Sequence, residues 1–271
     1  MNQKFSVLMS VYQKDNPVWL KQAIDSVLTN SICPDELVIM VDGPVGKEIQ
    51  KVLNEIAKNK IVRVLSHATN IGRGAALAYA VPKCNYALIA LMDADDICHK
   101  DRFEKQLSAF RVNEDLSVVG GQIQEVDSNT FGLLAKREVP LTHTEICKYL
   151  KTRMPFNNQT IMFKKSAILD SGNFKSFGLL EDYYMWVHVI ANGYKTSNLP
   201  DILVDMRVNP AMYGRRGGWK YFCMNKLLFK EMKKLGLLSS KDYYYTLSAR
   251  FVVQVLMPNC LRSYFYKRVL R

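Results

Sequence analysis

The sequence predicts an α/β protein with a mixed sheet covered by helices on both faces and a helical C-terminal appendix. In residues 1–100, near-continuous apolar runs alternate with amphipathic stretches of helical period, the pattern of mostly parallel strands buried on both faces. Hydrophobic residues make up 48% and charged residues 23% of the 271 residues, which are ordinary values for a globular protein with a large core. This composition excludes disorder as the main state.

Four apolar runs in this first part have the length of buried strands, at 5–11, 36–41, 61–65 and 86–92. Between them the apolar spacing predicts helices. The first helix follows Asp15 or Asn16 as its cap, with Pro17 in its first turn. The next two helices cover about 49–56 and 72–81.

Beyond residue 113 the pattern loosens into shorter elements. We expect further strands at 117–126, 133–139 and 159–164, and helices at 142–151 and 181–192. The economical division is a domain at 1–206, with halves at about 1–100 and 101–206, and a basic, aromatic, helical segment at 207–271.

No segment predicts a membrane span or a secretion signal. The run 86–92 is far shorter than the roughly 20 residues that a spanning helix needs, and residues 1–12 lack a long apolar stretch with a cleavage site. The six cysteines are scattered without a CxxC pair, which predicts free thiols in a reducing compartment. We therefore expect a cytoplasmic protein.

The excess positive charge lies in the last quarter of the chain. Residues 207–271 hold 14 Lys and Arg against 2 Asp and Glu, a difference that equals the net charge of +12 for the whole chain. Such a segment fits a solvated tail, a nucleic-acid surface or a patch for anionic lipid. Its Tyr and Phe residues beside Lys and Arg favour a membrane interface.

Polar residues follow three of the predicted strands, as Ser10-Val11-Tyr12, Asp42-Gly43 and Asp93-Ala94-Asp95-Asp96. Ligands of open α/β sheets bind beyond the carboxyl ends of the strands. The chain has neither GxGxxG after the first strand nor a P-loop motif, so a bound phosphate must be held in another way.

The carboxylates of Asp93, Asp95 and Asp96 would repel each other unless a cation lies among them. Mg²⁺ and Mn²⁺ prefer oxygen ligands and retain water and phosphate oxygens in their shell. In the structural alternative the loop is merely acidic, and Asp96 caps a helix at about 102–110.

Two further motifs have structural as well as functional interpretations. Glycines in 70–76 allow close backbone approach at the start of a helix, although a simple capped helix explains them too. The pair Glu181-Asp182 fits the N-terminus of a helix, where acidic residues are favoured.

Taken in order, the stretches SVLMSVY, VDG, NIGRGAALAYA, LMDADD and LLEDYYMWVHVIANGYK resemble the family 2 glycosyltransferases. The resemblance covers about residues 4–207 and is strongest to the group that builds bacterial exopolysaccharide and O-antigen units, of the amylovoran type. It implies a GT-A fold, with the nucleotide-sugar half first and the acceptor half second. Many members carry two adjacent Asp residues where this chain has Asp42-Gly43.

The resemblance implies roles for the residues at the strand ends. Asp42 and Arg73 would contact the nucleotide base in a pocket lined by Val11 and Tyr12, and Asn70 would order the neighbouring loop.

The DADD stretch corresponds to the DxD element of the family. Asp93 would reach the ribose, and Asp93 and Asp95, with Ala94 between them, would form the nucleotide and metal site. Asp182 would be the general base.

Other residues near these motifs have more open roles. Arg207, Arg215 and Arg216 are expected in a mobile basic loop that closes over the diphosphate, although a flexible, exposed basic loop without a ligand explains them equally well. Trp186 and His188 are expected to be structural, and Gln159 is a candidate acceptor contact.

Together the roles imply an inverting enzyme, dependent on Mn²⁺ or Mg²⁺, that moves a hexose from a UDP-sugar to a lipid-linked, polyprenyl-diphosphate saccharide. The metal would neutralise the leaving diphosphate, and the base would take the acceptor proton. The acceptor implies a peripheral location on the inner face of the cell membrane, through the basic C-terminus, with no nucleic acid as a partner.

Two alternatives remain at the level of the sequence. A sugar-phosphate nucleotidyltransferase has a similar sheet, although the Gly-rich loop after its first strand is missing here. A non-enzymatic, basic nucleic-acid-binding protein would explain the charge, but no RNP, zinc-finger or helix-turn-helix pattern accompanies it.

Overall fold

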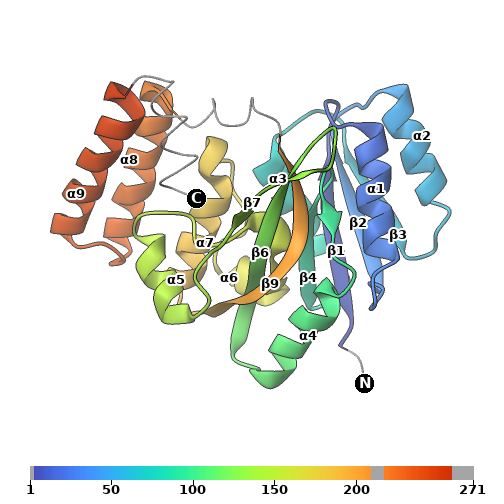
Figure 1. Ribbon diagram of the computed structural model, residues 1–271, viewed down its shortest axis with the longest axis horizontal. Coiled ribbons are helices and arrows are strands. Elements are labelled where there is room, and N and C mark those ends of the chain that lie inside the picture. Colours follow the sequence, from blue (N-terminus) through green and yellow to red (C-terminus); the bar gives the residue numbers. More distant parts are fainter. Residues whose placement is uncertain (1–2, 209–216, 258–271) are drawn as a thin grey trace.

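One mixed sheet organises the protein (Figure 1). The computed structural model describes residues 3–208 and 217–257, and in these residues the sheet has nine strands in the order β3-β2-β1-β4-β8-β6-β9-β5, with β7 paired to β6. The strands are β1 Phe5–Val11, β2 Glu36–Asp42, β3 Val62–His67, β4 Leu88–Asp93, β5 Ile97–Cys98, β6 Leu116–Asp127, β7 Leu133–Arg137, β8 Met162–Lys164 and β9 Lys195–Val208.

The first four strands form a parallel half-sheet. β1 pairs with β2 and β4, and β2 pairs with β3, all in parallel. Ser10 on β1 lies opposite Asp93 on β4, and Val11 lies opposite Val41 on β2. The carboxyl ends of these strands therefore meet at one edge of the sheet. Beyond β4, the strand β8 pairs antiparallel with both β4 and β6.

Helices cover both faces of the sheet, as predicted. One face carries α1 Pro17–Leu28, α2 Lys47–Ile56 and α4 Arg102–Val112. The other face carries α3 Arg73–Ala80, α5 His143–Leu150, α6 Lys165–Asp170, α7 Glu181–Ala191 and α8 Trp219–Lys234. The remaining helical elements are the 3₁₀ turns η1 Val81–Lys83, η2 Asn158–Thr160 and η3 Gly178–Leu180, the helix α9 Ser240–Phe251 and the π-helical turn η5 Val252–Leu256.

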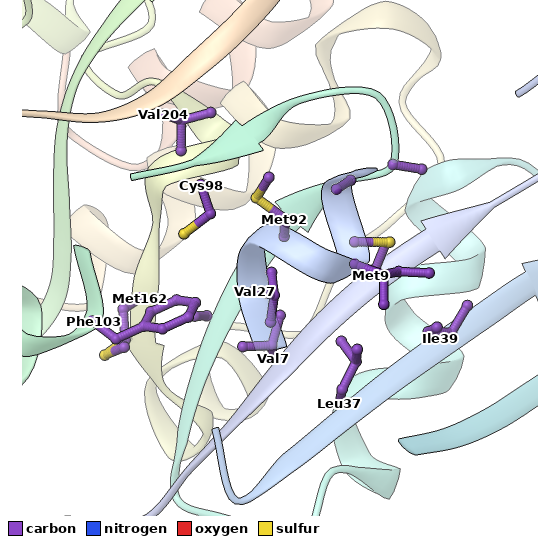
Figure 2. Close-up of a cluster of buried hydrophobic side chains, with 14 of the residues drawn as sticks. Val7, Met9, Val27, Leu37, Ile39, Met92, Cys98, Phe103, Met162 and Val204 are labelled. Atoms are coloured by element: carbon purple, nitrogen blue, oxygen red, sulfur yellow. The ribbon is translucent and has the colours of Figure 1, made fainter. Parts of the chain in front are cut away.

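Side chains of the central strands alternate between two hydrophobic cores. On β1, Val7 and Met9 enter the core drawn in Figure 2, while Leu8 between them enters the core on the opposite face. Leu37 and Ile39 of β2 join the first core in the same way. A strand buried on both sides reads as a continuous apolar run, so these strands are visible in the sequence.

One long strand is missing from the sequence-based prediction. β9 extends over 14 residues beside β6, where we expected no strand, because polar residues and Pro200 interrupt its apolar pattern. The short elements β5 and α6 are also absent from the prediction. The strand expected at 159–164 starts later, because η2 occupies its first residues.

The C-terminal helices share the core of the second face. Leu228, Phe229 and Met232 of α8 lie in the same cluster as Trp186 of α7. In Figure 1, α8 and α9 lie side by side at the end of the molecule away from α1 and α2. The boundary expected after residue 206 falls inside β9. Among the described residues, no helix has the length and apolarity to cross a membrane.

Candidate active site

The loop that begins α3 is held by Asp42 at the end of β2. The Oδ1 and Oδ2 atoms of Asp42 accept hydrogen bonds from the backbone N–H groups of Ile71 (2.7 Å) and Gly72 (2.9 Å). The side-chain amide of Asn70 donates to the backbone carbonyl of Asp42 at 3.1 Å. Asp42 is 4% exposed, so a hydrogen bond from a nucleotide base would need the second lone pair of an oxygen that already orders the loop.

Gly43 allows the loop after β2 to come close to the loop that begins α3. Its φ is +83°, and a Cβ at this position would lie 2.5 Å from the backbone nitrogen of Asn70, closer than real Cβ atoms come. Only glycine satisfies both conditions without strain. The close approach of two loops explains why a second aspartate does not follow Asp42 in this chain.

Arg73, at the first position of α3, connects two candidate catalytic carboxylates. Its Nη1 donates to Oδ1 and Oδ2 of Asp182 at 2.8 and 3.0 Å, and its Nη2 donates to Oδ1 of Asp93 at 2.9 Å. Burial would lower the pKa of Arg73, but the carboxylates of Asp182 and Asp93 outweigh it, so the pKa is raised and the guanidinium stays charged. One side chain thus fixes the end of β4 relative to α7.

Asp182, which the family resemblance predicts to be the general base, lies in the first turn of α7. Its side chain is 26% exposed, so one part of the carboxylate faces solvent while another faces Arg73. Burial raises its pKa above the ordinary value, and the positive charge of Arg73 opposes this rise. A carboxylate with a raised pKa and an open side can accept a proton from a bound hydroxyl.

The side chain of Glu181 caps α3 and is not a candidate catalytic group. Its carboxylate accepts a hydrogen bond from the backbone N–H of Gly74. A Cβ on Gly74 would lie 2.8 Å from Oε2 of Glu181 and 2.7 Å from the carbonyl of Lys175, so glycine is required for this contact. Burial, followed by the neighbouring charge of Asp182, raises the pKa of Glu181 to about 7.

Asp96, which we considered as a helix cap, has a different function in the fold. α4 begins after Asp101 and no side chain caps it. Asp96 is 2% exposed and accepts a hydrogen bond from the backbone N–H of Arg207 at 2.9 Å. Burial raises its pKa well above the ordinary value, and the carboxylates of Asp95 and Asp93 raise it further. The capping interpretation is therefore wrong.

Arg207 does not lie in a mobile loop, contrary to expectation. It belongs to β9 and is 5% exposed. Its guanidinium donates to the backbone carbonyl of Asp95 and to the side chain of Gln22, and it lies 5.5 Å from the ring centre of Trp19. Arg207 therefore clamps the DADD loop, and its guanidinium binds that loop and not a diphosphate. Arg215 and Arg216 lie outside the described residues.

Asp15 is a site residue that sequence reasoning considered only as a helix cap. The cap of α1 is Asn16, and Oδ2 of Asp15 instead accepts a hydrogen bond from the backbone N–H of Tyr12 at 2.9 Å. Burial raises the pKa of Asp15 to about 7, and the charges of Asp95 and Asp93 raise it as well. The loops after β1 and β4 thus form one acidic cluster.

Two residues expected to line the nucleotide pocket point their side chains elsewhere. Val11 is 1% exposed and Ala94 is 5% exposed, and both belong to the first hydrophobic core. Only their backbone can face a ligand. Tyr12 is 40% exposed. Trp186 is fully buried among aromatic rings, in agreement with its expected structural role.

The acidic cluster of Asp15, Asp93 and Asp95 fits a divalent cation. Asp95 is exposed on its loop, and crowding by the surrounding protein, followed by the charge of Asp93, raises its pKa to about 6. Within residues 3–208 and 217–257, no Lys, Arg or His forms an ion pair with Asp95 or Asp15, and no group of three or more potential ligands surrounds one point. The charges of Arg207 and Arg73 oppose the rise in the pKa of Asp95 only in part. The remaining negative charge suits Mg²⁺ or Mn²⁺, which also take water and phosphate oxygens.

The arrangement combines a place for a cation, a cationic bridge and a partly exposed base. Asp93 and Asp95 can hold a metal at the end of β4, where it would neutralise a phosphate leaving group. Asp182 lies on the other side of Arg73 and can take a proton. Such a site suits the transfer of a group from a phosphate ester to a hydroxyl.

Comparison with known sequences identifies the family. The family described as "Glycosyl transferase family 2" matches residues 6–176. The chain is 36% identical over 268 residues to an uncharacterized glycosyltransferase of Haemophilus influenzae, with 99% of each chain covered. It is 34% identical over 268 residues to the UDP-Gal:alpha-D-GlcNAc-diphosphoundecaprenol beta-1,3-galactosyltransferase of Escherichia coli, covering 99% of this chain and 97% of that one. An amylovoran biosynthesis glycosyltransferase of Erwinia amylovora is 28% identical over 267 residues, covering 97% and 98%.

The fold comparison agrees with these sequence matches. Residues 1–349 of TarS of S. aureus, solved in complex with UDP-GlcNAc, have a similar structure, with a TM-score of 0.69 at 16% identity, covering 99% of this chain and 76% of that one. The mixed sheet and its two helical layers are thus those of the GT-A fold. The matches decide against a nucleotidyltransferase and against a non-enzymatic protein, and we conclude that the chain belongs to glycosyl transferase family 2.

Proposed function

We propose that this glycosyltransferase is inverting and metal-dependent, and that it transfers a hexose from a UDP-sugar to a lipid-linked saccharide during the synthesis of a bacterial surface polysaccharide. The observation that carries this proposal is the bridge by Arg73 between Asp93 and Asp182. It joins the carboxylate expected to bind the donor to the carboxylate expected to activate the acceptor.

On the donor side, Asp93 would contact the ribose and, with Asp95, hold Mn²⁺ or Mg²⁺ against the diphosphate. Burial and the neighbouring carboxylates raise the pKa of Asp15 and of Asp95, and this crowding of negative charge supports a cation at this place. A bound metal supplies the positive charge that stabilises the departing UDP. Support for a UDP-sugar also comes from the relative in Escherichia coli, whose name specifies UDP-Gal.

On the acceptor side, Asp182 would accept the proton of the attacking hydroxyl. Its carboxylate is partly exposed and lies within hydrogen-bond distance of Arg73, which keeps it oriented. Direct attack on the side of the sugar opposite the leaving group inverts the anomeric centre. The same relative in Escherichia coli is named for a diphosphoundecaprenol-linked acceptor, which supports a lipid-linked saccharide here.

The lipid of such an acceptor would bring the enzyme to the inner surface of the membrane. Residues 217–257 carry seven Lys and Arg against two Asp and Glu. Exposed aromatic side chains accompany them on α8 and α9, including Trp219 (63% exposed) and Tyr245 (75% exposed). Cations beside interfacial aromatics suit an anionic lipid surface.

Calorimetric titration with UDP, with and without Mn²⁺, tests the donor part of the proposal. We expect the wild type to bind UDP only with Mn²⁺, and Asp95→Asn to bind at least tenfold more weakly. Asp115→Asn, in an exposed loop, is the matched control and should bind like the wild type. Failure of the wild type to bind UDP under either condition would refute the UDP-sugar assignment.

The acceptor part is tested by transfer from a panel of UDP-sugars to a synthetic prenyl-diphosphate saccharide. We expect Asp182→Asn to retain UDP binding and to lose transfer by at least two orders of magnitude, since general-base catalysis contributes about 10²–10⁴-fold. Transfer at the wild-type rate by Asp182→Asn would contradict its role as the base.

A further inference from the structure

We infer that Asn158 and Gln159 form a hydrogen-bond-donating subsite for the ring hydroxyls of a pyranose bound in the active site. The inference rests on the proposed glycosyl transfer and adds to it the residues that recognise the sugar. Both residues belong to η2, the 3₁₀ turn that precedes β8. Their side-chain amides are buried donors next to the proposed catalytic groups.

η2 lies beside the carboxyl end of β4. The backbone N–H of Leu91 donates to the carbonyl of Ile161 at 2.8 Å, and β8 runs antiparallel to β4. The chain that precedes Ile161 therefore continues alongside the last residues of β4, toward Asp93. This places η2 on the side of β4 away from β1.

The other neighbour of η2 is α7, which carries Asp182. Nε1 of Trp186 donates a hydrogen bond to Oδ1 of Asn158 at 3.2 Å. Trp186 follows Asp182 by four residues and so lies on the same face of the helix, one turn further on. Asn158 is thereby positioned between the helix of the proposed base and the strand that ends in Asp93.

Both amides have an unused donor group. Nδ2 of Asn158 and Nε2 of Gln159 are buried, and neither has a hydrogen-bond acceptor in the described part of the chain. The indole N–H of Trp186 is only a donor, so it fixes the carbonyl of Asn158 toward Trp186 and the NH₂ group away from it. Gln159 is only 5% exposed. Buried donors nearly always have partners, so these two indicate a ligand.

The backbone of η2 is held rigidly from the opposite side. Oγ1 of Thr160 donates to the carbonyl of Asn157 at 2.7 Å, and Nδ2 of Asn157 donates to the carbonyl of Gly121 at 2.9 Å. Nε2 of Gln106 donates to the carbonyl of Thr160 at 2.8 Å. Asn157 therefore points into the protein, whereas the amide nitrogens of Asn158 and Gln159 remain unpaired on a preorganised frame.

The chemistry of the two groups selects the ligand. An NH₂ donor cannot ligate a cation, and a neutral amide carries no charge to attract a phosphate. Hydroxyl oxygens are neutral acceptors, and a pyranose ring offers several of them in fixed directions. The sugar can be the one transferred from the donor or the first sugar of the acceptor.

Variants that remove only the donor groups test the inference. Gln159→Met keeps the length of the side chain without its NH₂ group, and Asn158→Asp keeps an oxygen for Trp186 but replaces the NH₂ group. Gln50→Met, on the exposed side of α2, is the matched control. Thermal melting establishes that each variant folds, so failure of one to fold leaves the other as the test.

We expect both variants to bind UDP with Mn²⁺ within twofold of the wild type and to lose at least tenfold in kcat/KM for transfer. If the transferred sugar is the ligand, the affinity advantage of the UDP-sugar over UDP and the rate of its hydrolysis without acceptor fall together. If the acceptor sugar is the ligand, its KM rises while UDP-sugar hydrolysis is unchanged.

Two results would overturn the inference, and they differ in what else they refute. Folded variants with wild-type kcat and wild-type KM for both substrates would refute the subsite alone. A wild type that binds neither UDP nor any UDP-sugar would refute the proposed function together with the subsite.

Discussion

Nη1 of Arg73 lies 2.8 and 3.0 Å from the two carboxylate oxygens of Asp182. The two residues are 109 positions apart in the sequence, and their contact connects the start of α3 with the start of α7. Because the cation stabilises the charged form of the carboxylate, it lowers the pKa that burial has raised. The contact thus sets both the orientation and the protonation of the proposed base.

Replacing Arg73 with Met should shift the acid limb of the pH profile of kcat/KM to higher pH. Asp182 acts as a base only when deprotonated, and without the guanidinium its pKa rises further, so activity is lost at a higher pH as the solution is acidified. We also expect kcat to fall by about 10²-fold, because the base is no longer positioned. Arg111→Met, on the exposed side of α4, should leave the profile unchanged. An unshifted acid limb in Arg73→Met would show that Arg73 does not influence the protonation of the base.

The acidic cluster should be destabilising in the metal-free protein above neutral pH. The pKa of Asp15 is raised from 3.8 to about 7, so the folded state holds a proton that the unfolded state releases, and this stabilisation disappears as the pH rises from about 4 through 7. Asp15→Asn keeps an oxygen for the Tyr12 N–H and removes the charge. We expect it to raise the free energy of unfolding by about 1 kcal/mol at pH 8, with no gain at pH 4.

Added Mn²⁺ should reduce this difference between Asp15→Asn and the wild type. A cation held by Asp93 and Asp95 compensates the negative charge that Asp15 contributes, so the wild type gains more from the metal than the variant does. Urea unfolding at pH 8, with Mn²⁺ and with EDTA, measures both effects. A gain from Asp15→Asn that is the same with Mn²⁺ and EDTA would place the cation away from this cluster.

Gly43 and Gly72 offer a matched test of loop packing, because both have positive φ, +83° and +87°. A Cβ at Gly43 would meet the backbone of Asn70, whereas a Cβ at Gly72 would meet no atom within 4 Å. Gly72→Ala should cost about 1 kcal/mol for the backbone conformation alone. Gly43→Ala should cost clearly more, about 3 kcal/mol, and should also weaken UDP binding. If Gly43→Ala and Gly72→Ala lower the free energy of urea unfolding equally, the two loops can move apart to accept a Cβ at residue 43.

Glu181→Gln should stabilise the protein at alkaline pH while keeping the cap on α3. The pKa of Glu181 is raised from 4.5 to about 7 by burial and then by Asp182. Stability from the protonated group is therefore complete below pH 4.5 and lost as the pH rises through 7. The amide oxygen of Gln can still accept from Gly74. In urea unfolding, we expect the free energy of unfolding of Glu181→Gln to exceed that of the wild type at pH 8.5 and to equal it at pH 4. The exposed control Glu48→Gln should show no such dependence on pH.

Whether a site residue could be predicted from the sequence depends on how far apart along the chain its contacts lie. Asp42, Asp93 and Asp95 could be found because each directly follows a buried apolar strand, and strand ends meet at one edge of a parallel sheet. The clamp of Arg207 on the DADD loop could not be found, since it spans 111 positions and depends on β9, whose polar residues conceal the strand. Asp15 was visible only as a helix cap, because nothing local shows that its loop lies beside that of Asp95.

The same distinction holds for side-chain direction. Val11 and Ala94 are next to the correct loops, but the alternation along β1 turns the side chain of Val11 into the core, and Ala94, in the turn after β4, is buried in the same core. Gln159 was named from the sequence as a candidate acceptor contact, whereas Asn158, just before the stretch expected to be a strand, was not. Their unsatisfied donors appear only when the partners of every buried amide are known.

Binding to anionic membranes should depend on one face of α8. Lys226, Lys230 and Lys233 are exposed and spaced so that they share a face of this helix, and Nζ of Lys233 lies 5.5 and 5.7 Å from the ring centres of Tyr243 and Tyr244. Each basic residue near an anionic surface contributes about 1 kcal/mol, so reversing all three to Glu should weaken binding by at least 10²-fold. The matched control reverses three exposed lysines near α2, namely Lys47, Lys51 and Lys58.

Co-sedimentation with vesicles containing 30% phosphatidylglycerol or only phosphatidylcholine measures this effect. We expect the wild type and the α2 control to bind the anionic vesicles, with affinity that falls as salt increases, and the α8 variant to remain in the supernatant. UDP binding should be equal in all three proteins, because the substitutions lie outside the donor site. Equal loss in both triple variants would mean that total charge and not α8 attracts the protein to lipid, and binding by the α8 variant would remove this helix from the membrane contact.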